Sequence, residues 1–163
     1  MIVLVNYYEE LSEDGEMKLS TKGRYGTRAL LELALHYGEE PVSLKDIACS
    51  QQISLSYLEH LVSPLIAGGL VRSVKGPKGG VSLARDPADI RLGEVMQLLE
   101  GSIAPTECVD NPEICERADF CVTREVWSEL RDVVGGVLNA TTLQDLVDRH
   151  REKTEVKEEM YYI

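Results

Sequence analysis

Three cysteines lie close together in the second half of the sequence: Cys108, Cys115 and Cys121. Thiolates are soft ligands that suit iron–sulfur clusters, zinc and copper(I). The Cys-x-x-Cys pairs of structural zinc sites are absent, and the wider spacing of six and then five intervening residues favours a cluster held by a pliable loop. The sequence therefore predicts an iron–sulfur site here, and three free thiols are the alternative. The fourth cysteine, Cys49, falls in a predicted helix, where we expect a small buried side chain.

Motifs of the common enzyme classes are missing from the sequence. It contains no Ser-His-Asp arrangement, no phosphate-binding strand–loop–helix and no His-Glu-x-x-His motif. Its three histidines are scattered over different predicted elements, and none is adjacent to the clustered cysteines. We therefore expect a protein that is not an enzyme.

Charge is distributed unevenly along the chain, whose net charge is −11. Residues 1–16 carry five acids and no base, residues 17–85 have a net charge of +4, and residues 86–163 have a net charge of −10. A basic part joined to acidic parts is typical of a protein in which only one part contacts phosphate. We therefore expect residues 17–85 to contact the phosphates of a nucleic acid, and the fold predicted for this part favours double-stranded DNA.

The hydrophobic pattern of this basic part predicts three helices followed by a β-hairpin. The first helix begins at Ser20, and Ser43 and Ser54 are expected to cap the second and third. The apolar faces predicted to be buried comprise Tyr25, Ala29, Leu30, Leu33, Ala34 and Tyr37, and then Leu55, Leu58, Leu61, Val62, Leu65 and Ile66. After Leu70, two segments of alternating pattern flank the turn sequence GPKGG. This order of elements predicts a mainly α-helical, winged helix-turn-helix fold.

Two groups of residues in this fold are candidates for DNA contact. The third helix exposes polar side chains in its first two turns, where they can reach base edges in the major groove. The hairpin turn places two lysines on a thin, glycine-rich loop that suits the narrow minor groove. A solvated helix face and an ordinary hairpin turn are the alternatives. The candidate DNA-binding residues are Lys22, Ser54, Ser56, Tyr57, Glu59, His60, Lys75, Gly76 and Lys78.

The remaining pattern predicts a helical C-terminal part. A short helix spans Leu92–Leu99, residues 102–120 are irregular, and a long amphipathic helix begins at Val122. Gly135 and Gly136 interrupt that helix, and close approach of the same helix from a partner subunit is a reason to tolerate them. A last short helix begins at Thr142 with Asp145, and residues 151–163 read as a charged tail.

These patterns divide the chain into four parts. Residues 1–16 are an N-terminal extension expected to be flexible, and residues 17–88 form the winged-helix domain. Residues 89–150 hold the cysteine loop and dimerisation helices, and the charged tail follows. No apolar run is long enough to span a membrane and no secretory signal is recognisable, so we expect a cytoplasmic protein.

Three segments of the sequence resemble the iron–sulfur cluster regulator (IscR) branch of the Rrf family of winged-helix transcription regulators. They are MKLSTKGRYGTRALLELA, ISLSYLEHLVSPLIAGGLVRSVKGPKGG and CVDNPEICERADFCVTREVW. The resemblance covers residues 17 to about 147. It implies a homodimer joined through the long helix, with Ser56, Glu59 and His60 facing bases in the major groove and Lys75 entering the minor groove.

The resemblance also implies a cofactor, and here the chain departs from the pattern. Regulators of this branch bind a 2Fe–2S cluster through three cysteines and a histidine three residues after the last one. Arg124 occupies that position and cannot ligate iron. The fourth ligand must come from a carboxylate, a backbone group, an exogenous thiol or the partner subunit. Related nitric-oxide sensors hold a 4Fe–4S cluster with an acid near the first helix, where Glu32 is the nearest acid here. A 2Fe–2S cluster is favoured, and a 4Fe–4S cluster is the alternative.

These observations predict a DNA-binding regulator, and the resemblance adds a repressor or activator of genes for cluster biogenesis or for redox and nitrosative stress. Cluster binding would order the cysteine loop. It would thereby change the operator affinity or selectivity of the winged-helix domains of the two subunits. Two alternatives stay open. The first is a family regulator that acts through a protein partner, such as a cysteine-biosynthesis enzyme. The second is a thiol-redox sensor without a cluster.

Overall fold

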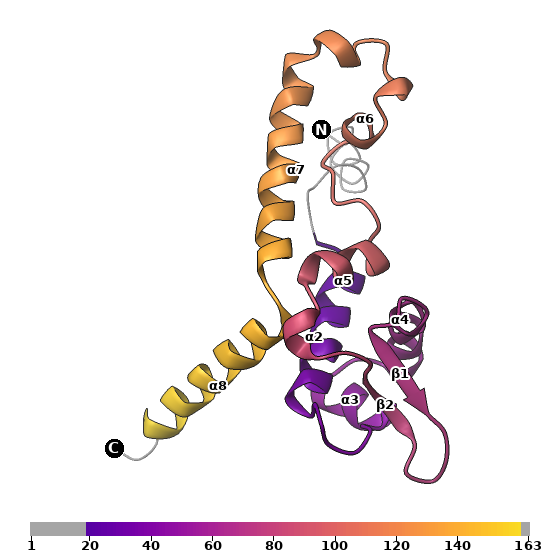
Figure 1. Cartoon of the computed structure of the whole chain (residues 1–163), viewed down its shortest axis with the longest axis vertical. Coiled ribbons are helices and arrows are strands. Elements are labelled where there is room, and N and C mark those ends of the chain that lie inside the picture. The colour runs from indigo at the N-terminus through magenta and orange to yellow at the C-terminus, as the bar shows by residue number, and fades with distance from the viewer. Residues whose placement is uncertain (1–18, 161–163) are drawn as a thin grey trace, which may run out of the picture.

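The computed structural model describes residues 19–160, so the N-terminal extension and the last three residues lie outside the described part. It is mainly helical with one antiparallel hairpin, as predicted (Figure 1). The winged-helix part comprises α2 (Thr21–Leu35), α3 (Leu44–Gln51), α4 (Leu55–Ala67), β1 (Val71–Val74) and β2 (Gly80–Leu83). None of the helices in residues 19–160 is long and apolar enough to cross a membrane.

Serines begin the three helices of the winged-helix part. The Ser20 hydroxyl accepts a hydrogen bond from the backbone N–H of Lys22 at 3.0 Å. Ser43 accepts in the same way from Asp46 at 3.1 Å, and Ser54 from Tyr57 at 3.3 Å. Each hydroxyl satisfies an N–H group that the helix itself leaves without a partner. The predicted helix starts are therefore confirmed.

The hydrophobic core lies between α2, α3, α4 and the hairpin, and it extends to α5 (Leu92–Leu99) and to the first turns of α8 (Leu143–Met160). Its fully buried large side chains are Leu30, Ile47, Leu58, Leu65, Leu70, Ile90, Val95, Leu143 and Val147. Two residues expected in the core are exposed instead. Tyr37 follows the end of α2, and Ile66 faces outward in the last turn of α4.

The hairpin forms the wing. Val71 pairs with Leu83 and Val74 pairs with Gly80, so residues 75–79 make the turn. Val42, before α3, extends this small sheet through an isolated bridge to Val81, with two backbone hydrogen bonds of 2.9 Å. The bridge fixes the wing against the start of α3 and thus against the helical part.

The C-terminal part comprises η2 (Pro87–Asp89), α5 (Leu92–Leu99), α6 (Glu107–Asp110), η3 (Pro112–Ile114), η4 (Ala118–Phe120), α7 (Val122–Ala140) and a last helix. The residues from α6 to α7 form a tall column above the winged-helix body, whereas α5 packs within that body (Figure 1). The segment 102–120, predicted to be irregular, therefore contains three single helical turns. We call residues 102–121 the cysteine loop.

The last helix, α8, spans Leu143–Met160 and is longer than the sequence predicted. Residues 151–160, expected to form a charged tail, continue the helix instead. Leu143 and Val147 anchor its first turns in the core, while residues 148–156 are exposed. The hydrophobic pattern did not reveal this second half of the helix, because an exposed helix without an apolar stripe has the same pattern as a solvated tail.

Candidate nucleic-acid interface and cysteine loop

The candidate reading helix α4 presents its predicted polar face to solvent. Ser56, Glu59 and His60 are exposed on it, while the Ser54 hydroxyl is engaged in capping the helix. Tyr57 is half-buried, because its ring packs edge-on against Tyr25 of α2 with the ring centres 6.2 Å apart. Ser56, Glu59 and His60 are therefore free to meet a ligand, whereas Ser54 and Tyr57 also have structural roles.

Glu59 faces a shallow cavity of about 310 Å³ between α3, α4 and the wing. Ser43 and Lys45, at the start of α3, line the same cavity together with Ser73 of β1. Sequence reasoning did not select Lys45, although it lies at the start of a serine-capped helix, where free backbone N–H groups favour a phosphate, and this was a usable signal. Its exposed ammonium group lies on the face shared by the reading helix and the wing.

The start of α2 adds a second cation to this interface. Lys22 lies with Tyr57 and His60 of α4 around a cavity of about 500 Å³, whose floor includes Leu98 and Leu99 of α5. The structure thus brings Lys22 beside the reading helix, although more than thirty residues of sequence separate them. This end of α2 belongs to the same face as α4.

The wing turn carries the other two predicted lysines, both exposed. Gly76 has a φ of +121°, a conformation that favours glycine, so the tight turn depends on this residue. Lys78 pairs with Glu40 at 3.2 Å. Both side chains are more than 75% exposed, so the pair contributes little to the stability of the fold. Among residues 19–160, Lys75 has no acidic partner within ion-pair distance.

The cysteine loop holds Cys108 in α6, Cys115 after η3 and Cys121 immediately before α7. All three are partly exposed free thiols. Within the described residues, no group of three Cys, His, Asp or Glu side chains is gathered closely enough to hold a metal ion. The loop therefore presents the predicted donors without assembling them, and Glu32 does not join them: its carboxylate accepts a hydrogen bond from Gln51 at 2.7 Å.

Cys121 has the most distinct environment of the three thiols. Its sulfur lies 3.2 Å from the Thr123 hydroxyl oxygen. This side-chain contact, with a further contribution from the Arg124 backbone N–H, lowers the pKa of the Cys121 thiol. A larger thiolate fraction makes this sulfur a better ligand and a better nucleophile.

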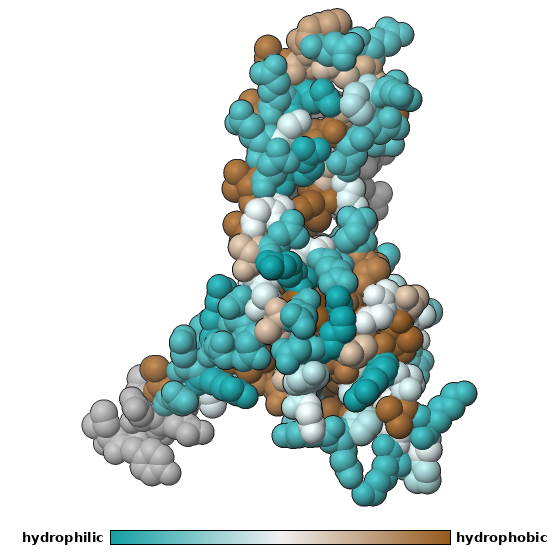
Figure 2. All heavy atoms as spheres, in the orientation of Figure 1, coloured by the Kyte–Doolittle hydropathy of each residue, from teal (hydrophilic) through white to brown (hydrophobic). Residues whose placement is uncertain are grey.

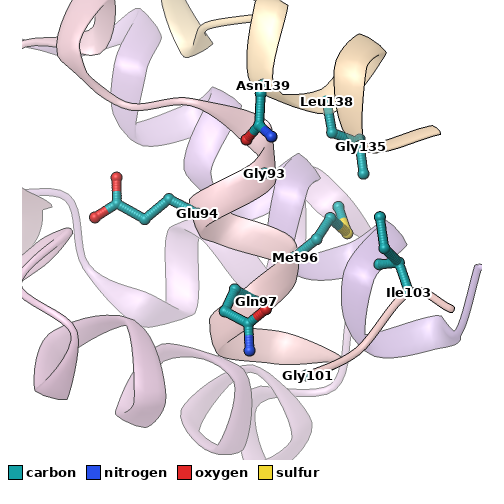
Figure 3. Close-up of a pocket in the computed structure, with 9 residues that line it drawn as sticks. All are labelled: Gly93, Glu94, Met96, Gln97, Gly101, Ile103, Gly135, Leu138 and Asn139. Carbon is teal, nitrogen blue, oxygen red and sulfur yellow. The ribbon is translucent and has the colours of Figure 1, made fainter. Parts of the chain in front are cut away.

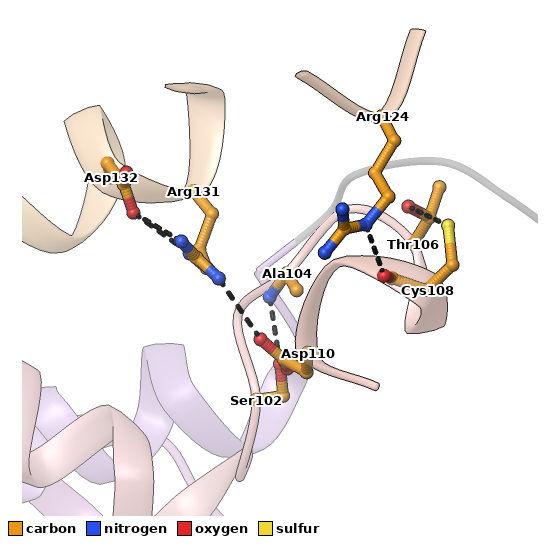
Figure 4. Close-up of polar contacts among 8 residues, drawn as sticks. All are labelled: Ser102, Ala104, Thr106, Cys108, Asp110, Arg124, Arg131 and Asp132. Carbon is orange, nitrogen blue, oxygen red and sulfur yellow. Dashed lines mark hydrogen bonds and ion pairs between the residues drawn. The ribbon is translucent and has the colours of Figure 1, made fainter. Parts of the chain in front are cut away.

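Arg124, in the first turn of α7, extends its side chain to the cysteine loop from the position where the resemblance places a histidine (Figure 4). Its Nε donates to the carbonyl oxygen of Cys108 at 2.8 Å, and Nη1 donates to that of Ala118 at 3.4 Å. A guanidinium has no lone pair to give a metal. Arg124 therefore connects two segments of the loop to α7 and supplies no ligand.

The prediction that Cys49 is buried is wrong. Its side chain is exposed on α3, because the buried face of this short helix is formed by the two preceding residues, Ile47 and Ala48. Cys49 stands outside the cysteine loop and is a useful reference thiol.

The long helix α7 has no buried residue, although it is amphipathic. Its inner face packs on α5 and the loop, and with them it lines a cavity of about 380 Å³ that includes Met96, Ile103 and Leu138 (Figure 3). Its outer face exposes a row of valines, Val122, Val126, Val133 and Val137. Apolar atoms are visible along the outer edge of the column (Figure 2). We call these four valines the outer face of α7.

A Cβ atom on Gly136 would have no neighbour within 4 Å, and one on Gly135 would meet only Ile103, at 4.0 Å. No second helix within the described chain therefore accounts for this glycine pair.

The fold has three helices, of which the third is the serine-capped candidate reading helix, followed by a two-stranded wing that bears lysines. This combination defines the winged helix-turn-helix class of DNA-binding proteins. The Rrf2 family profile, described as an iron-dependent transcriptional regulator, matches residues 19–149. The chain belongs to the Rrf2 family and is a DNA-binding transcriptional regulator rather than an enzyme.

Relatives of two kinds are almost equally similar to the chain. The transcriptional regulator CymR of Bacillus subtilis is 46% identical over 130 residues, covering 80% of this chain and 89% of that protein. The transcriptional regulator IscR of Serratia proteamaculans is 45% identical over 132 residues, covering 81% and 80%. Sequence identity therefore does not separate the two kinds.

Solved structures give the same picture and confirm the fold. The structure of B. subtilis CymR, described as its global cysteine regulator, superimposes with a TM-score of 0.69 and covers 81% of this chain and 97% of that one. The structure of T. potens IscR superimposes with a TM-score of 0.71 at 42% identity, covering 83% and 90%.

Proposed function

We propose that this regulator binds its DNA operator as a homodimer, and that an iron–sulfur cluster held by Cys108, Cys115 and Cys121 sets its operator affinity or selectivity. The observation that carries this proposal is the cysteine loop itself. Three thiols lie on one segment that begins at α5, beside the DNA-facing end of α2, and ends at α7. A cluster bound by that segment could therefore change the position of the DNA-binding face through the contact between α5 and α2.

The donor set fits an iron–sulfur cluster in its chemistry, because three thiolates are the ligands that such clusters prefer. Closing the loop around a cluster would bring together thiols that are separate here. A 2Fe–2S cluster remains favoured over a 4Fe–4S cluster, with a fourth ligand from outside the three cysteines. When bound, the cluster would supply a group whose presence and charge respond to iron supply and to oxidants.

The outer face of α7 supports the homodimer. Val133 and Val137 are each more than 60% exposed, and a row of such side chains on one helix is costly to leave in water. The open space at Gly136, on the same side of the helix, permits close approach of another backbone. A second copy of α7, which presents the same row, would cover both features.

The DNA-binding face follows from the exposed side chains described above. In the proposed complex, Ser56, Glu59 and His60 would meet bases in the major groove, and Lys75 would enter the minor groove with Gly76 allowing the close approach. Lys22, Lys45 and Lys78 would contact phosphates. The positive charges of these three lysines offset the repulsion between phosphate and the carboxylate of Glu59.

Anaerobic purification of the full chain tests the cluster. We expect visible absorbance with matching amounts of iron and acid-labile sulfide. Cys115→Ala should remain a folded protein and lose this absorbance, while Cys49→Ala, which removes an exposed thiol elsewhere, should keep it. A Cys115→Ala protein with full absorbance, or a wild-type chain that holds no iron after reconstitution, would overturn the cluster assignment. Footprinting of loaded and cluster-free protein on a duplex selected from a random pool then tests the effect on DNA.

The similarity to CymR supports a second candidate function, a regulator that acts through a protein partner such as a cysteine-biosynthesis enzyme. A third, thiol-redox sensing without a cluster, is supported by the three free, partly exposed thiols of the cysteine loop, of which Cys121 has a lowered pKa. A colourless anaerobic preparation that binds such an enzyme would favour the second. A colourless preparation whose DNA binding changes reversibly with thiol oxidation would favour the third.

A further inference from the structure

Glu100 makes an unusual contact between two parts of the molecule. It follows α5 directly, and its Oε1 accepts a hydrogen bond from the Ser20 hydroxyl at 2.5 Å and another from the Gly23 backbone N–H at 2.8 Å. Both donors belong to the start of α2. Among residues 19–160, no base lies within ion-pair distance of this carboxylate, so the start of α2 provides its described polar partners.

The packing around Glu100 leaves little freedom. A Cβ atom on Gly23 would lie 2.6 Å from the Glu100 Oε1 and 3.0 Å from the Met96 sulfur. One turn later, a Cβ atom on Gly26 would collide with the Leu99 side chain. The first two turns of α2 therefore pack directly on the last turn of α5, and a shift of one helix must displace the other.

Each side of this contact leads to a different functional element. On one side, Lys22 lies between Ser20 and Gly23 in sequence and shares its cavity with His60 of the reading helix. On the other side, Gly101 has a φ of +79° and turns the chain into the cysteine loop, where the Ser102 hydroxyl bonds to Asp110 of α6. Glu100 is thus one residue from the loop turn and in direct contact with the DNA-facing end of α2.

We propose that Glu100 is a positioning residue that couples the cysteine loop to the DNA-facing end of α2. This inference rests on the proposed DNA-binding function, but it does not require that the loop hold a cluster. Coupling between two sites is reciprocal in binding free energy, so a loop whose state influences DNA binding must respond in turn when DNA binds. The coupling can therefore be measured in cluster-free protein.

The experiment measures how fast iodoacetamide alkylates the loop cysteines of the cluster-free full chain, with and without a duplex that the full chain has selected from a random pool. In the wild type, we expect DNA to change the rates at Cys108, Cys115 or Cys121 by at least about fivefold, the lower end of typical coupling. In Glu100→Ala the change should fall below about twofold. Glu100→Gln, whose side-chain oxygen can still accept from Gly23, should restore most of it.

Three controls separate the possible outcomes. Glu113→Ala removes an exposed acid within the loop and should behave as wild type. Thermal melts followed by circular dichroism show whether each variant is folded, and Ser20→Ala replaces Glu100→Ala if the latter does not fold. A Glu100→Ala protein with the wild-type change, or a wild type that binds DNA without any change in the loop, overturns the coupling alone. A wild type that retains no DNA overturns the proposed function as well.

Discussion

The Nε of Arg124 donates a hydrogen bond to the carbonyl oxygen of Cys108 at 2.8 Å, joining the first turn of α7 to α6 across the cysteine loop (Figure 4). The same guanidinium reaches the carbonyl oxygen of Ala118. Since both acceptors are backbone groups, the arginine constrains the path of the loop whatever side chains surround it. Arg124 therefore holds two segments of the cysteine loop to α7 through their backbone.

This relationship predicts that Arg124→Ala loosens the cysteine loop of the cluster-free chain. Hydrogen bonds from a charged donor contribute about 1.5–3 kcal/mol when well formed, and partial exposure reduces that value. Amide hydrogen exchange, followed by mass spectrometry, should become at least several-fold faster for residues 105–121 and stay unchanged for α2. Arg117→Ala, at an exposed position of the same loop, is the control. Equal exchange in both variants would show that Arg124 does not hold the loop.

The outer face of α7 predicts that a charge at Val133 separates the dimer. Val133→Glu would place two unpaired carboxylates in the proposed interface, and burying an unpaired charge costs several kcal/mol. We expect the dissociation constant of the dimer, measured by analytical ultracentrifugation, to rise at least about a hundredfold. Val156→Glu on α8 is a matched control, because Val156 is 64% exposed and Val133 is 65% exposed. Dissociation caused by both substitutions, or by neither, would argue against this interface.

The sequence predicted most of the fold because its signals are local. Ser20, Ser43 and Ser54 mark helix starts through hydrogen bonds to residues two or three positions away, and the wing follows from a glycine-rich turn between alternating segments. Two errors also have local causes. Cys49 lies on the exposed side of a helix of only eight residues, which is too short for its apolar face to be recognised. The second half of α8 lacks an apolar stripe.

The candidate site was less accessible to sequence reasoning because it depends on contacts between distant segments. Lys22 and His60 line the same cavity only because α2 packs on α4. Glu100 accepts a hydrogen bond from Ser20, which lies 80 positions earlier in the sequence. Neither relationship has a spacing that a pattern could detect. The pairing of Lys78 with Glu40 likewise depends on where the wing lies, and it makes Lys75 the more available cation of the two.

The wing therefore predicts different effects for its two lysines. Each cation that neutralises DNA phosphate charge, from within the minor groove or beside the backbone, contributes about 0.9 to the slope of log K against log salt, and a dimer carries two wings. Lys75→Ala should reduce the steepness of that slope by up to about 2, and Lys78→Ala by less, because Glu40 already neutralises part of its charge. Fluorescence anisotropy with a labelled duplex over a range of salt concentrations measures both. Lys153→Ala on α8 should leave the slope unchanged, and a larger effect from Lys78 than from Lys75 would contradict this reading.

The start of α8 predicts a pH-dependent contribution to stability. The Asp145 carboxylate accepts hydrogen bonds from the backbone N–H of Thr142 at 2.7 Å and from the Thr142 hydroxyl at 2.8 Å, and these bonds lower the pKa of Asp145. Because the folded chain favours the ionised form, this carboxylate stabilises the fold at any pH above its ordinary pKa, and the contribution is lost as the pH falls through the lowered value. The cap matters for the whole fold, since Leu143 and Val147 directly after it are buried in the core.

Asp145→Asn should therefore lower the free energy of unfolding at pH 7, as measured by urea denaturation. The difference from wild type should be the same at pH 6 and pH 7 and should shrink as the pH falls below about 4, because the wild-type carboxyl then becomes protonated too. Glu152→Gln, at an exposed position of the same helix, should show no such convergence. A deficit for Asp145→Asn that stays constant down to the lowest pH at which the wild type folds would show that the hydrogen-bond geometry, and not the charge, stabilises the start of α8.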